Sequence, residues 1–297
     1  MNKELLLSCV PSAPLSKEPS PNNINKNISR TRFGKIKIKS RCKSVKAIRI
    51  TLLFLLVATI YGLMTLNFGN IIWGQAIGLT WDNLRIAFGQ ASFNQITFGY
   101  ALQQLLITFS LGMLATIFGA FIAFFAAVFC SKNLVKPRQA NAVKSVASLI
   151  RAIPAILWVF MFVAAVGLGG TPAVIGLTLH SAAFLTKAYS ESIEEMDGGA
   201  IEALRAGGAS FWHIVFQAVI PASITYMAAW TFLRFEQNVI NAFAIGAMAG
   251  VGGLGFSLWM SANQFHDLSE LGAITIMIAV MVIALEMIMT RVKTKLR

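Results

Sequence analysis

Long apolar stretches separated by short polar segments dominate this chain. A helix needs about 20 mostly apolar residues to cross a membrane, and all but the fourth stretch approach or exceed that length. The six stretches lie at residues 48–68, 100–129, 146–166, 173–189, 220–244 and 271–290. The pattern predicts an all-α, polytopic membrane protein with about six transmembrane helices.

The composition supports a location in lipid. Hydrophobic residues make up 56% of the 297 residues and charged residues only 12%, whereas a typical soluble domain has roughly 25% charged residues. An ordinary water-soluble globule is therefore excluded.

The positive charges indicate how the chain is oriented. Lys and Arg concentrate on the cytoplasmic side of membrane proteins. With both termini cytoplasmic, 23 of the 25 Lys and Arg residues fall in the inner segments, residues 1–49, 131–151, 187–213 and 291–297. We expect a multi-pass membrane protein with both termini in the cytoplasm.

The same pattern divides the chain into segments. We expect a disordered basic tail (1–47), a first span (48–68), an external loop (69–99), a membrane core (100–290) and a short cytoplasmic tail (291–297). A basic block directly before an apolar span more often sets topology and meets anionic lipid headgroups than binds nucleic acid. The sequence has no nucleic-acid recognition motif, so membrane lipid is the expected partner of the tail.

The loop at residues 187–213 is unusual for a connection between two spans. It holds five of the twelve acidic residues and reads as two short helices around Gly207-Gly208, with Ser210 as N-cap of the second. A folded loop that leaves the membrane is suited to contact with another protein.

This loop and the start of the following span resemble a motif of bacterial ABC-type import permeases. That motif reads E-A-A, three residues, G, nine residues, then I-x-L-P. The matching segments here are Glu202-Ala203-Leu204, Gly208 and Ala218-Val219-Ile220-Pro221. Leu204, Ala218 and Ile220 depart conservatively from the pattern.

The resemblance implies that the loop docks into a cleft of a separate ATP-hydrolysing subunit. It assigns this coupling role to Glu202, Ala203, Gly208 and Pro221. Gly208 would permit a sharp turn, Glu202 offers a charge to a basic cleft, and Pro221 can occupy the first turn of the next span. The alternative is an ordinary amphipathic loop in which these residues occur by chance.

Further segments are similar to the permease subunit of phosphonate importers, over roughly residues 95–295. They are Arg151–Pro154, Val166–Gly169, Glu202–Ala209, Arg234–Glu236 with Asn238, and Gly250–Gly255. The resemblance implies a permease of a bacterial cytoplasmic (inner) membrane for phosphonate-type oxyanions. The family also includes members for phosphite, so phosphite or another small anion is the alternative substrate.

The resemblance also implies which partners the chain has and that the chain is not itself a catalyst. A second copy of the chain, an extracytoplasmic substrate-binding protein and an ABC ATPase subunit would complete the transporter. ATP would be used by the partner subunit, and this chain would bind no cofactor and catalyse no reaction.

One polar stripe lies within the fifth apolar stretch. Arg234, Gln237, Asn238 and Asn241 share one helix face, because they are spaced at i, i+3, i+4 and i+7. Two interpretations stay open: a translocation path in which Arg234 favours a phosphorus oxyanion, or an internal network that holds helices together.

Four other residues are candidates for gating or packing. Arg151 is either a snorkelling interfacial residue or a gate, and Glu236 faces away from the stripe and could neutralise a neighbouring Arg. Gly250 and Gly253 belong to a glycine run that lacks the Lys-Ser/Thr of a phosphate-binding loop, so a helix break or close packing is expected. The three histidines are far apart in the expected topology and predict no metal site.

Two other classes of function fit less well. An autonomous secondary transporter or channel often has repeated halves and buried carboxylates, and no repeat is visible. An intramembrane enzyme would need a Ser/His, HExxH or paired Asp arrangement within the spans, and the sequence has none.

Overall fold

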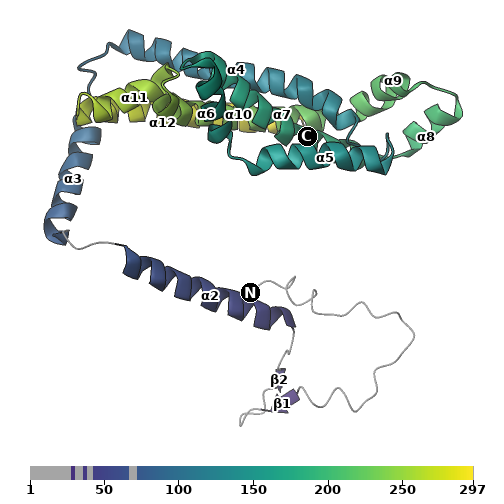
Figure 1. The fold of residues 1–297 in the computed structure, drawn as a ribbon, viewed down its shortest axis with the longest axis horizontal. Helices are drawn as coiled ribbons and strands as arrows, with labels where there is room; N and C mark the ends of the chain where they lie inside the picture. The colour runs from purple at the N-terminus through teal and green to yellow at the C-terminus, as the bar shows by residue number, and fades with distance from the viewer. Residues whose placement is uncertain (1–27, 31–35, 39–42, 67–71, 297) are drawn as a thin grey trace. The chain divides into compact units, whose positions relative to one another are not determined.

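The computed structural model describes residues 28–30, 36–38, 43–66 and 72–296, and Figure 1 shows their elements. Contacts within the chain define two units, residues 1–73 and 74–297, which are described separately.

The first unit contains a strand pair and one helix. Strands β1 (Ile28–Arg30) and β2 (Ile36–Ile38) pair antiparallel, with Ile28 opposite Ile38. These six residues lie in the tail that we expected to be disordered, and here the structure differs from the expectation. Isoleucines alternate with other residues in β2, a pattern that favours a strand. Most of the remaining tail lies outside the described residues.

Helix α2 (Lys43–Thr65) begins five residues before the expected first span. Its segment Lys46–Thr65 is long and apolar enough to cross a membrane, and none of it is buried within the chain. A helix that is apolar on all sides is suited to contact with lipid.

Ten helices and one π-helical turn make up the rest of the described chain. They are α3 (Trp73–Gly89), α4 (Phe98–Val128), α5 (Pro137–Ala152), α6 (Ala155–Val166), α7 (Gly170–Glu194), α8 (Gly199–Ala206), α9 (Phe211–Ile214), η3 (Val215–Val219), α10 (Ile220–Ala249), α11 (Gly253–Asn263) and α12 (Leu268–Leu296). Helix α3 occupies the region that we expected to be an external loop.

Helices α4 and α7 form the centre of this unit. They pack along each other, and α6, α10 and α11 pack around them (Figure 1). Two glycines of α4 allow close approach: a Cβ on Gly119 would lie 2.7 Å from the Ser181 Cβ, and one on Gly112 would lie 2.9 Å from the Val239 Cα. Larger residues there would separate α4 from α7 and α10.

The expected spans agree with most of these helices. Besides Lys46–Thr65, the segments Phe98–Val128, Phe211–Ala249 and Leu268–Val292 are long and apolar enough to cross a membrane. Helix α7 contains the short fourth stretch; its 25 residues can span a bilayer, although it is less apolar than the others. Its neighbours bury many of its residues, so it needs fewer apolar side chains.

The third expected span is not one straight helix. It is divided between α5 and α6, which meet at an angle of 83°. Pro154 has no backbone N–H to bond the Ile150 carbonyl, and the residue before a proline favours an extended backbone. Ile153 is extended, and the Trp158 indole N–H donates to the Ile150 oxygen at 3.0 Å. The break is therefore encoded by proline and completed by tryptophan.

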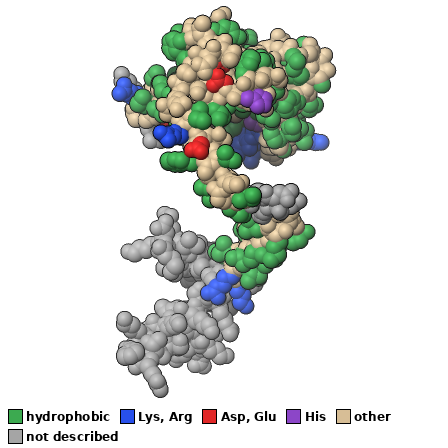
Figure 2. All heavy atoms as spheres, turned by 90° about the vertical axis from the view of Figure 1, so that its left-hand side faces the viewer, with side chains coloured by type: hydrophobic (Ala, Val, Ile, Leu, Met, Phe, Trp, Pro, Cys, Tyr) green, Lys and Arg blue, Asp and Glu red, His purple; other side chains and the backbone are tan. Residues whose placement is uncertain are grey.

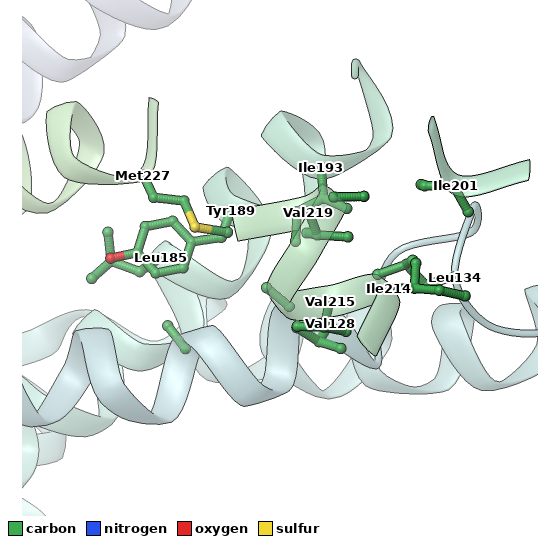
Figure 3. Packing of buried hydrophobic residues seen from close by; sticks show 13 residues of the cluster. Val128, Leu134, Leu185, Tyr189, Ile193, Ile201, Ile214, Val215, Val219 and Met227 are labelled. Carbon is green, nitrogen blue, oxygen red and sulfur yellow. The ribbon is translucent and has the colours of Figure 1, made fainter. Parts of the chain in front are cut away.

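Three apolar clusters form the core. One joins α4, α6, α7 and α10, and another joins α4, α10, α11 and α12. The third lies where α4, α7, α8, α9 and η3 meet, and Figure 3 shows it from close by. Its labelled members are Val128, Leu134, Leu185, Tyr189, Ile193, Ile201, Ile214, Val215, Val219 and Met227.

A buried carboxylate connects the first turn of α12 to the segment before α4. Glu270 Oε2 accepts the backbone N–H groups of Asn94, Gln95 and Ile96, and Oε1 accepts the Ser261 hydroxyl at 2.7 Å. We call this arrangement the Glu270 latch. Glu270 is fully buried, and no sequence pattern predicted this role.

A second carboxylate stabilises the start of α12. Asp267 caps α12 through the Glu270 N–H, and the Asn94 amide and this N–H hold the pKa of Asp267 below its ordinary value. Figure 2 views the molecule from the side on the left of Figure 1, and charged side chains are sparse among the described atoms of that face.

Candidate functional site

The segment from α7 to α10 forms a folded loop, the α8–α9 loop (residues 195–214). Helix α8 ends in a Schellman motif: the Gly208 N–H bonds the Arg205 carbonyl, and the Ala209 N–H bonds the Leu204 carbonyl. Gly208 has φ +79°, a conformation that L-residues rarely adopt. The turn therefore requires glycine at Gly208, as the sequence predicted.

Helix α9 begins as expected. The Ser210 hydroxyl accepts the His213 N–H, and Ser210 has the extended backbone of an N-cap. Pro221 lies in the first turn of α10. A proline ring clashes with the carbonyl four residues earlier. This clash explains why the helix widens into the π-helical turn η3 directly before Pro221.

The α8–α9 loop is firmly attached to the long helices. Ile201 of α8 and Ile214 of α9 are buried in the cluster of Figure 3 with the ends of α4 and α7. The Arg205 guanidinium donates to the Asn133 carbonyl at 2.8 Å and to the Leu134 carbonyl at 3.4 Å. A displacement of the loop would therefore move the helices to which it is bound.

The residues assigned to coupling are on the outer side of this attachment. Glu202, Ala203 and Gly208 are exposed, and so is Gly207 beside them. The loop thus has a buried side that packs on the helices and an exposed side that can receive a partner.

The polar stripe of α10 divides into two parts. Arg234 is 3% exposed and donates through Nε to the Ser181 hydroxyl at 3.0 Å, through Nη1 to Gln237 Oε1 at 3.3 Å, and through Nη2 to His180 Nδ1 at 2.8 Å. Its guanidinium carbon also lies 5.2 Å from the centre of the Phe184 ring.

Asn238 shares the Ser181 hydroxyl with Arg234 and also contacts α4. It is fully buried, donates to Thr116 Oγ1 at 2.9 Å, and accepts the Ser181 hydroxyl at 3.0 Å. It therefore connects α10 to α4 and α7. Asn241 is half-buried, and no hydrogen bond joins it to either part within the described residues.

Sequence reasoning missed the α7 residues of this site. His180 and Ser181 lie in an apolar stretch, and an ionisable residue within a span is by default a functional candidate; His180 could have been found by that criterion. Ser181 could not have been found in this way, because the hydroxyl of a serine in a helix often bonds a backbone carbonyl of the same helix.

The gating candidates are spread over several helices. Arg151 lies in the last turn of α5, at the break before α6, and Glu236 is half-buried on α10. Gly250 ends α10 with φ +60°, and the Gly253 N–H bonds Gln104 Oε1 at 2.9 Å. A Cβ on Gly253 would lie 2.5 Å from Thr108 Oγ1, so this glycine allows α11 to pack against α4.

The helical fold, its apolar spans and the attached loop define a multi-pass membrane permease of the ABC transporter type. The fold is similar to that of a chain of the inward-facing MetNI methionine ABC transporter, with a TM-score of 0.61 and 19% identity over 69% of this chain and 100% of that chain. The chain belongs to the family described as binding-protein-dependent transport system inner membrane component, whose model matches residues 119–296.

Several of the relatives are named as permeases for phosphorus compounds, and others as carnitine transport permeases. The phosphate-import permease protein PhnE of Mycolicibacterium smegmatis (strain ATCC 700084 / mc(2)155) is 31% identical over 191 residues, which cover 64% of this chain and 35% of the relative. The phosphite transport system permease protein PtxC of Stutzerimonas stutzeri is 32% identical over 57% of this chain and 60% of its own length. The chain thus spans about a third to three fifths of these two relatives.

A shorter relative is matched almost completely. The putative cryptic phosphonate transport system permease protein PhnE2 of Escherichia coli (strain K12) is 30% identical over 40% of this chain and 97% of its own length. The names of these three relatives specify three different phosphorus compounds: phosphate, phosphite and phosphonate.

Proposed function

We propose that this chain is the membrane-spanning subunit of an ATP-driven importer for small phosphorus oxyanions. The observation that carries the proposal is the α8–α9 loop, which exposes Glu202, Ala203 and Gly208 on one side and packs Ile201 and Ile214 against the long helices on the other. Family membership and the names of the relatives support the same function.

The loop gives this function a mechanical basis. A separate ATPase subunit that closes around the exposed side would push on the loop, and the buried cluster would transmit that displacement to α4, α7 and α10. Close-packed interiors transmit displacement because they have few voids. The chain itself performs no bond chemistry; ATP is hydrolysed by its partner.

The complete transporter would contain further subunits. One chain provides one such loop, so a homodimer would present two loops to two ATPase subunits. An extracytoplasmic binding protein would deliver the anion. The substrate is a phosphonate, with phosphite or phosphate as the alternative, because these anions share a tetrahedral phosphorus centre with negatively charged oxygens.

The experiment is uptake by cells that express the whole transport system. We predict that Gly208→Asp leaves the chain in the membrane but abolishes uptake of methylphosphonate, phosphite and phosphate alike. A side chain at φ +79° strains the turn by roughly 1–2 kcal/mol, and its carboxylate occupies the exposed side on which the partner docks.

The matched control is Gly207→Ala. Gly207 has φ −75°, and an added Cβ would make only ordinary contacts, at 3.5 and 3.6 Å, so uptake should stay near the unmodified level. Uptake that persists in Gly208→Asp, or with an ATPase subunit unable to hydrolyse ATP, would contradict the proposed function.

A further inference from the structure

Arg234 is a buried cation whose partners are all uncharged. Its three hydrogen bonds go to a hydroxyl, an amide oxygen and an imidazole nitrogen. The salt bridges of the described residues, Lys144–Glu194 and Lys187–Glu191, do not include it. A charge inside a membrane is costly unless it is compensated. The hydrogen-bond partners of Arg234 carry no negative charge that could compensate it.

The contact with Arg234 determines the protonation of His180. A guanidinium has only donors, so His180 Nδ1 must accept the bond from Nη2. The imidazole is therefore neutral and carries its proton on Nε2. His180 adds a second N–H donor to the site and no positive charge.

Arg151 brings a second guanidinium to the same region. Helix α5 packs antiparallel along α7: Lys144 pairs with Glu194, and Ser148 lines a small cavity with Thr186. Arg151, in the last turn of α5, therefore lies further along α7 in the direction of His180. It is half-buried, and in the described chain no hydrogen bond or ion pair joins its side chain. The negative end of the α5 helix dipole stabilises this cation. It does not supply hydrogen-bond acceptors for the N–H groups of the guanidinium.

The group is rich in donors and poor in acceptors. Arg151 offers all its N–H groups, Arg234 has two left, and His180 Nε2–H and the Gln237 amide group add more. Gln237 is exposed, so the donors reach the surface of the chain. Two positive charges with several convergent N–H donors match an anion with several oxygens.

We propose that Arg151, His180, Arg234 and Gln237, the donor cluster, form a binding site for one tetrahedral phosphorus oxyanion within the membrane-spanning part of the chain. This inference rests on the proposed function and names the residues that receive the substrate. Asn238 and Ser181 are positioning residues: the Ser181 hydroxyl, fixed by Asn238, holds Arg234 Nε.

The donor chemistry also determines selectivity. Every group in the donor cluster can donate to an oxygen, and none addresses the substituent that distinguishes methylphosphonate, phosphite and phosphate. The donor cluster therefore discriminates oxyanions from neutral or cationic solutes, and it accepts all three phosphorus anions.

The test is concentration-dependent uptake by the complete transporter reconstituted in liposomes, with methylphosphonate, phosphite and phosphate as probes. In Arg151→Gln and Arg234→Gln we expect the half-saturating concentration to rise about tenfold or more for each probe, because each variant removes charge-assisted hydrogen bonds. Arg151→Lys, which keeps the charge, should recover part of this loss.

Arg138→Gln is the matched control, since Arg138 is an exposed arginine of the same helix α5; its half-saturating concentration should not change. Co-purification of the ATPase subunit identifies assembled variants. Unchanged half-saturation in assembled Arg151→Gln and Arg234→Gln would overturn the donor cluster while leaving the proposed function intact. Absence of ATP-dependent uptake in the unmodified transporter would instead refute the proposed function.

A structural ion pair with a second copy is the competing explanation. If Glu236→Gln reproduced the Arg234→Gln defect and both variants lost the homodimer, Arg234 would be a dimer contact and the donor cluster would be overturned. If Glu236→Gln transported normally while Arg234→Gln raised half-saturation, the donor cluster would be supported.

Discussion

Single side chains in this protein satisfy several backbone groups at once. The Glu270 carboxylate receives three backbone N–H groups and one hydroxyl at a fully buried position. Asn94, Gln95 and Ile96 precede the first turn of α4, where no helical carbonyl is available to them. The latch therefore fixes the start of α4 to the start of α12 through one residue.

We predict that Glu270→Gln lowers the free energy of unfolding by roughly 2–3 kcal/mol. The amide has a weaker acceptor, and its NH₂ group would face other donors, which leaves buried N–H groups unsatisfied. Denaturant unfolding of the purified full chain in detergent measures the change. Glu286→Gln, an exposed carboxylate of the same helix, should change stability by less than about 0.5 kcal/mol; equal effects would contradict the latch.

At the scale of elements, the break between α5 and α6 decides where a charged side chain ends up. A straight helix over residues 146–166 would keep Arg151 near one end of the span. The 83° bend instead leaves α5 packed beside α7, with Arg151 in its last turn on the side toward His180. The broken helix is thus a requirement for the proposed donor cluster.

We predict that Trp158→Phe destabilises this break by about 1 kcal/mol, the net contribution of a typical hydrogen bond. The phenyl ring keeps most of the packing but cannot donate to the Ile150 carbonyl, whose usual donor is missing at Pro154. Thermal unfolding in detergent should show a lower midpoint. Trp259→Phe is the control, because the Trp259 indole N–H has no hydrogen bond to other described residues; a similar loss there would mean that ring size, not the bond, matters.

For the whole molecule, the loop and the latch mark two regions that should lie on opposite sides of the membrane. The α8–α9 loop follows α7, and the turn between α11 and α12 follows α10, which is long and apolar enough to cross a bilayer. The distribution of Lys and Arg predicts a cytoplasmic position for the loop. This orientation is also what docking of a cytoplasmic ATPase requires.

We predict the accessibility of two introduced cysteines in a chain whose three native cysteines are replaced by alanine. Glu202→Cys should react with a membrane-impermeant maleimide only after the cells are permeabilised. Gln264→Cys, an exposed position between α11 and α12, should react in intact cells. Labelling of Glu202→Cys in intact cells would reverse the orientation and remove the basis for ATPase docking.

Much of the architecture could be predicted because it depends on local properties. Apolar length identified the long spans, Ser210 and Pro221 marked helix starts, and Gly208 marked a turn that only glycine forms without strain. Helix α3 was missed because its apolar residues are too few for a span. The bend was missed because a proline allows a break but does not specify its angle.

The sequence by itself determined the membrane class, the number of apolar stretches, the charge asymmetry and the loop with its resemblance to ABC import permeases. These features follow from hydropathy, charge and turn chemistry over short segments, since each helix satisfies its own backbone hydrogen bonds. Only the tertiary structure brought His180 to Arg234, joined Asn238 to Thr116 of α4, and joined Glu270 to residues more than 170 positions away. Such contacts depend on how distant helices pack, which no local pattern encodes.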